Sequence, residues 1–404
     1  MLVVGPRAEP NSARFMSQTP NEARTLFFEF DDSRNPLPMR VGPPLPRFTL
    51  AYEMYGTMNA DRSNVVLLYH AMTGSQHAAG LNTQVEGLDG RWTDELHEGW
   101  WDGFIGPGKA VDTDRYCVVC ANFLGGCYGS TGPASINPET GARWGPSFPV
   151  LRMCDVVESQ MRLLDHLGVR TLHAVVGASL GGFLALLTAT RHPDRVRLVL
   201  PIGTGVETTI DQRLLNFEQV TAIEADPHFH GGDYYEGARP DVGLALARRI
   251  AHKTFISPEA LRDRARAEVV SQRPPHGWYE MNHPVESYML HQGQKFVRRF
   301  DANSYLRILD AWQWFNLAAE AGAKDLRELF RRCRNQEFLV FSIDYDHTFE
   351  RKEQEKLVRL LKQAGVPVMW ITVHSEKGHD AFLLEPRLFT PHIQAVLNRP
   401  EDHA

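Results

Sequence analysis

Apolar residues are arranged along this chain in short uninterrupted runs that alternate with longer amphipathic segments. A run such as 65–69, with no charged residue, is typical of a strand covered on both faces of a sheet. The runs that predict buried strands are 65–69, 116–121, 172–176, 196–200, 338–342 and 368–372. Helical periodicity marks 156–167, 351–364 and a last segment near 387–398. This alternation predicts an α/β fold with a largely parallel sheet and right-handed crossovers.

Two further β-type runs, 26–30 and 48–52, flank a proline-rich connection. Proline cannot donate to a central strand ladder, so we expect these runs to form antiparallel strands at one edge of the sheet.

The pattern changes between 206 and 334, where helical periodicity dominates, as in 244–250 and 305–319. A helical insertion of this length between two parts of a sheet predicts a lid domain that follows the sixth strand. We therefore expect four segments. They are a disordered polar segment at 1–22, the first part of the core at 23–205, the helical lid at 206–334 and the second part of the core at 335–404. Met16 is an alternative start.

Composition and charge exclude several classes of protein. The formal net charge of −6 over 404 residues gives no basic field for nucleic acid or anionic lipid. No apolar run reaches the ~18 residues of a membrane-spanning helix, and the N-terminus does not resemble a signal peptide. We expect a cytoplasmic enzyme. Cys117 and Cys120 have the spacing of a redox or metal pair, but they lie in an apolar run, so we interpret them as core residues.

The segment Gly177-Ala178-Ser179-Leu180-Gly181 places a serine between a predicted strand and a predicted helix. This Gly-x-Ser-x-Gly context is typical of a nucleophile on a sharp turn, with its hydroxyl exposed at the carboxyl edge of the sheet. The alternative is a glycine-rich loop that binds phosphate. The strand before it and the helix after it favour the nucleophile.

A serine hydroxyl needs a base and an orienting acid, which in this arrangement follow later in the chain. His379, in the loop after the run 368–372, is the predicted base, and His374 is the competitor at the strand end. Asp346, after the run 338–342, is the predicted acid, with Asp344 as the alternative.

Two backbone N–H groups are needed to stabilise an oxyanion. We assign them to Leu180, the residue after the nucleophile, and to Met72, in the loop after the strand 65–69. His70 in the same loop is expected to brace it rather than to act as a base. No metal-ligand spacing or nucleotide-binding motif is present in the sequence, so we predict neither a metal nor a bound cofactor.

Several segments together resemble the homoserine O-acetyltransferase family of the α/β-hydrolase superfamily. They are 52–59, 70–75, 124–133, the serine turn, 231–235, 300–306 and 378–383. The resemblance implies that an acetyl or succinyl group passes from coenzyme A to the serine and then to an acceptor hydroxyl. It also implies a helical lid over a tunnel, a homodimer formed through that lid, and Asp346 rather than Asp344 as the acid.

The resemblance also implies substrate-binding positions, namely Val220, Tyr235, Asp380 and Arg213. The family carries an arginine for the substrate carboxylate where our alignment places Val220, which cannot form that charge-assisted pair. Arg213, two turns earlier, is a doubtful replacement, and the family's acidic pair reads Gln313 and Asn316 here. Asp380, expected near the acceptor amine, is kept; a helix N-cap is its alternative role.

These departures favour hydrolysis of short-chain, acetate-type esters by a serine acyl-enzyme. The alternative is an acetyl-CoA-dependent O-acetyltransferase acting on homoserine or another small alcohol in methionine biosynthesis, with acetyl-CoA as co-substrate. A third hypothesis, a non-catalytic binding protein of the same fold, is disfavoured by the intact serine, aspartate and histidine candidates.

Overall fold

The computed structural model describes residues 22–88, 90–267, 278–279 and 281–399. The expectations for the N-terminal segment up to residue 21, including Met16, lie outside the described residues. Glu22, which the prediction included in that segment, forms a bridge with Leu81. No helix in the described part of the chain is both long and apolar enough to cross a bilayer.

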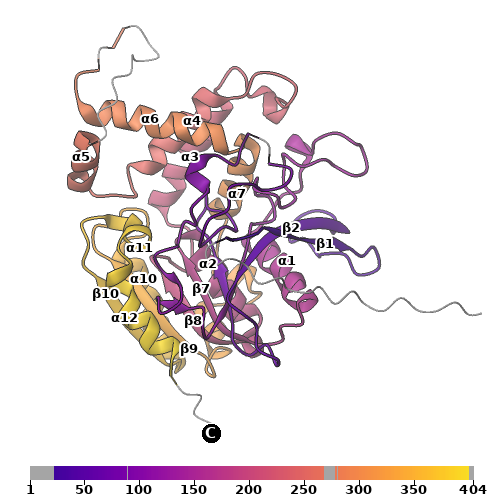
Figure 1. The fold of residues 1–404 in the computed structure, drawn as a ribbon, viewed down its shortest axis with the longest axis vertical. Helices are drawn as coiled ribbons and strands as arrows, with labels where there is room; N and C mark the ends of the chain where they lie inside the picture. Colours follow the sequence, from indigo (N-terminus) through magenta and orange to yellow (C-terminus); the bar gives the residue numbers. More distant parts are fainter. Residues whose placement is uncertain (1–21, 89, 268–277, 280, 400–404) are drawn as a thin grey trace, which may run out of the picture.

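An eight-stranded sheet forms the centre of the molecule, in the order β1-β2-β6-β3-β7-β8-β9-β10 (Figure 1). Its strands are β1 Leu26–Asp31, β2 Arg47–Tyr55, β3 Val65–Tyr69, β6 Cys117–Ala121, β7 Leu172–Ala178, β8 Val196–Ile202, β9 Glu337–Ile343 and β10 Val368–Val373. The β1–β2 and β2–β6 pairs are antiparallel and the other pairs are parallel. The predicted antiparallel edge and parallel centre are both present. A small second sheet, β4 Ile105–Gly106 with β5 Val111–Asp112, was not predicted.

Each face of the sheet is covered by helices. Side chains alternate along a strand, so Val66 and Leu68 of β3 face one apolar cluster while Leu67 and Tyr69 face the other. The first cluster includes residues of α12 Pro386–Leu397 and α11 Ala381–Leu384. The second includes residues of α1 Met153–His166, α2 Leu180–Arg191 and α10 Arg351–Ala364. Cys117 and Cys120 are fully buried in β6, as the apolar run predicted.

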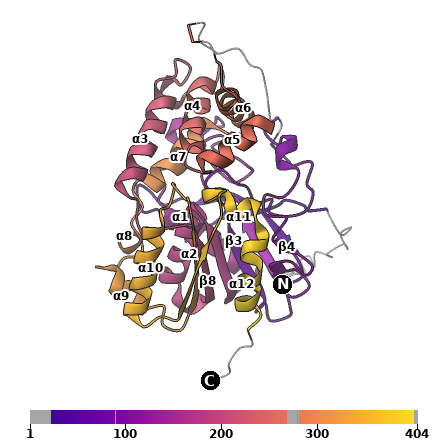
Figure 2. The same ribbon diagram turned by 90° about the vertical axis from the view of Figure 1, so that its left-hand side faces the viewer.

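The predicted helical insertion lies between β8 and β9. It contains α3 Ile210–Glu224, α4 Asp241–His252, α5 Pro258–Ala267, α6 Pro284–Arg299, α7 Ala302–Gln313, α8 Leu317–Glu320 and α9 Leu326–Arg331. Helices α3 to α7 form a layer beyond the end of the sheet, while α8 and α9 lie beside the core (Figure 2). The carboxylate of Glu320, at the end of α8, accepts from the Cys154 N–H of α1 at 2.7 Å. The lid predicted at 206–334 therefore includes two short helices that belong with the core.

Candidate active site

Ser179 lies on a strained turn between β7 and α2. Its φ and ψ of 58° and −126° are unusual for a residue with a side chain, and such strain is typical of functional turns. Neighbouring glycines make the turn possible. A Cβ on Gly177 would lie 2.1 Å from the Gly181 oxygen, and one on Gly181 would lie 2.5 Å from the Tyr69 oxygen. The turn therefore packs directly against the end of β3.

His379 and Asp346 form a buried pair at the same edge of the sheet. The His379 Nδ1 donates to Asp346 Oδ2 at 2.7 Å, and Asp346 Oδ1 accepts the N–H groups of Thr348 at 2.9 Å and Phe349 at 2.7 Å. Burial alone lowers the pKa of His379, but the charge and hydrogen bond of Asp346 raise it above its ordinary value. This contact fixes the tautomer and leaves Nε2 as the atom that accepts a proton.

The two alternative residues pair with each other instead. His374 Nδ1 contacts Asp344 Oδ2, and the His374 side chain is largely exposed. Asp346 therefore forms the hydrogen bond to His379, the predicted base, whereas Asp344 contacts only its competitor His374. The structure also brings Ser179, Asp346 and His379 to one region, because each follows the carboxyl end of a parallel strand, β7, β9 or β10.

The predicted oxyanion donors lie on two segments that meet at the serine turn. Leu180 is the first residue of α2, and Met72 lies in a turn closed by the Gly74 N–H and the Ala71 oxygen at 2.9 Å. Pairing of Tyr69 with Gly177 in adjacent strands places this turn beside Ser179. The backbone N–H groups of Leu180 and Met72, which the sequence predicts as oxyanion donors, are thus carried by segments next to Ser179.

His70 braces the Met72 turn. Its Nδ1 donates to the Ala71 oxygen at 2.7 Å, and its Nε2 accepts from the Phe123 N–H at 3.3 Å. Burial lowers the pKa of His70 to about 4, so the ring is neutral at physiological pH. It therefore holds the loop, as expected from the sequence.

Two arginines that the sequence pattern did not single out lie beside the loops of the site, Arg248 near the His379 loop and Arg299 near the Met72 loop. The guanidinium of Arg248, on α4, lies over the rings of Phe255 and Phe296 at 5.3 and 5.0 Å. Phe255 also lies 6.2 Å from the His379 ring. Arg299, at the end of α6, donates to the Thr73 oxygen at 3.2 Å and to the Tyr128 hydroxyl at 2.7 Å.

Asp380, directly after His379, feels the charge of Arg248. Burial raises the pKa of its carboxyl group above the ordinary value, although the positive charges of His379, Arg248 and Arg264 lower it. Its backbone N–H donates to the Phe255 oxygen at 3.0 Å. Asp380 occupies the N-cap position of α11, but its side chain makes no capping hydrogen bond. Asp380 is thus at the N-cap position that the alternative named, without the side-chain hydrogen bond of a cap.

Val220 and Arg213, the substrate-binding positions inferred from the alignment, both have surroundings that the structure describes. Val220 lines an open groove with Phe217, Leu306 and Gln313, and that groove's lining includes none of the three candidate catalytic residues. The Arg213 guanidinium donates to the Gln313 oxygen at 2.5 Å, so it ties α3 to α7. The absence of a cation at 220 therefore does not show that the site lacks a carboxylate anchor.

The altered polar pair and Tyr235 also have structural partners. Gln313 Nε2 donates to the Arg213 oxygen at 3.3 Å, and Asn316 caps α8 by accepting the Ala319 N–H at 3.0 Å. The Tyr235 hydroxyl donates to Asp301 Oδ2 at 3.1 Å, and Asp301 caps α7. Tyr235 is therefore seen to hold the start of α7, with no contact to the three candidate catalytic residues in the described part of the chain. Within the described ranges, no group of three or more metal-ligating side chains is present.

Comparisons with known proteins agree on both the fold and the family. The model of the alpha/beta hydrolase fold family matches residues 64–386. The chain is 42% identical to the homoserine O-succinyltransferase of Alkalilimnicola ehrlichii, covering 93% of this chain and 94% of that protein. It is 40% identical to the homoserine O-acetyltransferase of Solidesulfovibrio magneticus, covering 92% of each.

Solved structures with a similar fold include a homoserine O-acetyltransferase and an esterase. The homoserine O-acetyltransferase of Bacillus anthracis has a TM-score of 0.79 at 27% identity and covers 95% of this chain and 99% of its own. Esterase E22 has a TM-score of 0.81 at 24% identity, covering 93% and 100%, which shows the shared fold alone.

The esterase interpretation rested mainly on Val220, which lines a groove that the three candidate catalytic residues do not line. The relatives of about 40% identity instead support its alternative, acyl transfer from an acyl-CoA. Relatives of this identity, matched over nearly their whole length, show that the chain is an enzyme that belongs to the homoserine O-acyltransferase family of the alpha/beta hydrolase superfamily.

Proposed function

We propose that this enzyme transfers an acyl group from acyl-CoA to the hydroxyl of homoserine. The observation that carries the proposal is the pair Arg248 and Asp380 beside His379. The Arg248 guanidinium has no hydrogen-bond acceptor among the described residues, although it is stacked between two aromatic rings. A cation and a carboxylate next to each other complement the carboxylate and ammonium groups of an amino acid.

In the first half of the reaction, Ser179 Oγ attacks the thioester carbonyl while His379 Nε2 accepts its proton. The N–H groups of Met72 and Leu180 stabilise the oxyanion of the tetrahedral intermediate. Collapse of the intermediate breaks the carbon–sulfur bond, and His379 returns the proton to the leaving thiolate of coenzyme A. The products are the acyl-serine and free coenzyme A.

In the second half, the homoserine hydroxyl attacks the acyl-serine and gives its proton to His379. The second tetrahedral intermediate expels the Ser179 oxygen, which takes that proton back. Asp346 remains ionised and holds the imidazolium that forms in each half. Arg248 and Asp380 would hold homoserine by its charged groups, which directs its hydroxyl rather than water to the acyl-serine.

We also propose that the protein forms a homodimer through α3. Large apolar side chains are exposed on this helix and beside it: Ile210 by 71%, Leu214 by 59%, Phe217 by 63% and Trp314 by 59%. Positions 210, 214 and 217 share one face of a helix. A contiguous apolar surface of this kind is typical of a protein interface.

The test is a paired assay on the purified protein. Acetyl-CoA or succinyl-CoA is supplied with homoserine and release of the free thiol is followed, beside hydrolysis of ethyl acetate and 4-nitrophenyl acetate. We expect thiol release that depends on homoserine and is abolished in Ser179→Ala. Ester hydrolysis with no homoserine-dependent thiol release would overturn the proposal and restore the esterase interpretation. The preferred acyl-CoA identifies the acyl group.

A further inference from the structure

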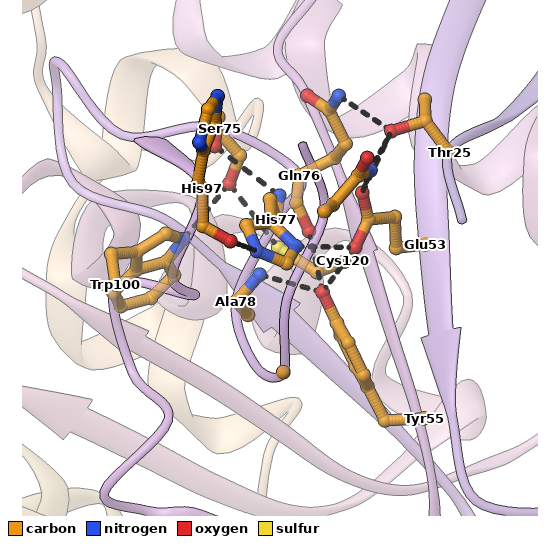
Figure 3. Close-up of polar contacts among 12 residues, drawn as sticks. Thr25, Glu53, Tyr55, Ser75, Gln76, His77, Ala78, His97, Trp100 and Cys120 are labelled. Atoms are coloured by element: carbon orange, nitrogen blue, oxygen red, sulfur yellow. Dashed lines mark hydrogen bonds and ion pairs between the residues drawn. The ribbon is translucent and has the colours of Figure 1, made fainter. Parts of the chain in front are cut away.

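A buried polar cluster lies behind the loop that carries Met72, and no step of the proposed reaction uses it. At its centre are Glu53 of β2 and His77, both 1% exposed or less, with Glu53 Oε2 and His77 Nδ1 2.8 Å apart. Figure 3 shows Glu53 and Tyr55 directed from β2 toward the segment 75–78. A carboxylate and an imidazole are costly to bury, so their presence here calls for a physical explanation.

Glu53 and His77 are both held by several hydrogen bonds. Glu53 accepts from the Thr25 hydroxyl at 2.7 Å and from Asn82 Nδ2 at 2.9 Å. Burial raises the pKa of Glu53, but His77 and the hydroxyl groups of Thr25 and Tyr55 outweigh it and hold the pKa below its ordinary value. His77 Nε2 lies 3.0 Å from the His97 carbonyl oxygen. With Glu53 ionised, both nitrogens of His77 face hydrogen-bond acceptors, so the ring is held from both sides.

Other titratable groups around the pair do not compensate its charges. Burial raises the pKa of the Tyr55 hydroxyl and of the Cys120 thiol, so both stay neutral. Asp102, which feels the charge of His77, is paired with Lys109 at 3.0 Å. The Glu53 carboxyl group and the His77 ring are therefore paired with each other inside the protein.

The cluster grips the segment that follows the Met72 turn. The Tyr55 hydroxyl lies 2.7 Å from Glu53 Oε2 and accepts the Ala78 N–H at 2.6 Å. The Trp100 indole donates to the Ser75 oxygen at 2.9 Å, and the Trp100 N–H donates to the His77 oxygen at 3.3 Å. The turn is thus held on one side by His70 and on the other by this cluster.

We propose that the hydrogen-bonded pair Glu53 and His77 is a positioning device that fixes the Met72 N–H in the oxyanion hole. The inference rests on the proposed function, because the Met72 N–H matters only if Ser179 forms a tetrahedral intermediate. The pair touches no reacting atom. It acts through the backbone of residues 75–78, so its loss lowers the rate of acylation rather than the affinity for substrate.

The test compares Glu53→Gln and His77→Gln with the matched control Glu320→Gln, another buried glutamate, which caps α1. The readout is the acylation burst with 4-nitrophenyl acetate, which needs neither homoserine nor coenzyme A. We expect the burst rate to fall roughly 10- to 100-fold in both cluster variants, less than the ~10²–10³ typical when an oxyanion donor is removed. KM should change little, and the control should match the wild type.

Unchanged burst rates in folded Glu53→Gln and His77→Gln would overturn the inference. A wild type that gives a normal burst but no homoserine-dependent thiol release would instead overturn the proposed function, so the two failures are distinguishable. If the variants do not fold, the wild type itself supplies the test. In amide hydrogen exchange of the wild type, we expect the Ala78 N–H, which donates to the Tyr55 hydroxyl, to be protected. Rapid exchange of the Ala78 N–H would show that the cluster does not hold this segment and would overturn the inference.

Discussion

At the scale of single residues, the pKa of His379 sets the pH dependence of activity. His379 must be neutral to accept the Ser179 proton, and Asp346 raises its pKa above the ordinary value of 6.5. Activity should therefore be lost as the pH falls through that raised value, and kcat/KM for 4-nitrophenyl acetate should show an acid limb with its midpoint above 6.5. A midpoint below the ordinary value would contradict the Asp346 contact.

Removing the orienting carboxylate tests the same contact more directly. In Asp346→Asn, the imidazole loses the charge that stabilises its protonated form and the acceptor that fixes its tautomer. We expect kcat to fall by about 10⁴-fold, as in other serine triads. Asp344→Asn is the matched control because Asp344 pairs with the exposed His374. An equal loss in both variants would show that the assignment to Asp346 is wrong.

The residues Arg248 and Asp380 belong to recognition of the acceptor. Arg248→Met removes a guanidinium that would bind the homoserine carboxylate, and a hydrogen bond to a charged group is worth about 1.5–3 kcal/mol. We therefore expect kcat/KM for homoserine to fall roughly 10- to 150-fold in Arg248→Met. In Asp380→Asn, kcat/KM for homoserine should also fall. Hydrolysis of 4-nitrophenyl acetate, measured in parallel, should be retained. Equal losses with both substrates would place Arg248 in the acylation machinery instead.

At the scale of elements, strands and catalytic loops could be predicted from the sequence, but the helix that faces the site could not. The strand runs are apolar on both faces and end at recognisable turns, so position indicates Ser179 and His379. Position leaves Asp344 and Asp346 open, and only the family resemblance favours Asp346. Arg248 lies in the amphipathic segment 244–250, whose pattern predicts a packed helix without saying which polar residue points toward the sheet. Alignment on a local Asp-Pro motif pointed to α3 for the anchor, whereas we propose that it lies on the next helix, α4.

The loop after β8 supports a prediction about geometry at this scale. Gly203 has a φ of +50°, and a Cβ there would lie 3.2 Å from Asp346 Oδ2 and 3.6 Å from His379 Nδ1. Gly203→Ala should push the pair apart and lower kcat on the order of 10-fold or more, because small displacements of reacting groups are costly.

Gly322→Ala is the control for Gly203→Ala. Gly322 has a φ of +66° with nothing within 4 Å of the added Cβ. Both variants should lose about 1–2 kcal/mol of stability from the left-handed backbone, measured by thermal unfolding. Only Gly203→Ala should lose kcat. A loss of kcat in both variants would mean that destabilisation alone explains the effect.

At the scale of the whole molecule, the exposed apolar face of α3 bears on assembly. Burial of one large apolar side chain contributes about 1.5–3 kcal/mol, and in a two-fold symmetric dimer each position is buried twice. Phe217→Asp should therefore shift the dimer to monomer at concentrations where the wild type is dimeric, as measured by sedimentation or light scattering. Leu388→Asp is the control, since Leu388 is 38% exposed on α12, which covers the core sheet away from the lid. A wild type that is monomeric at every concentration, or a Leu388→Asp variant that dissociates equally, would contradict assembly through α3. Dissociation of Phe217→Asp alone would show that the lid, besides covering the site, joins two copies of the enzyme.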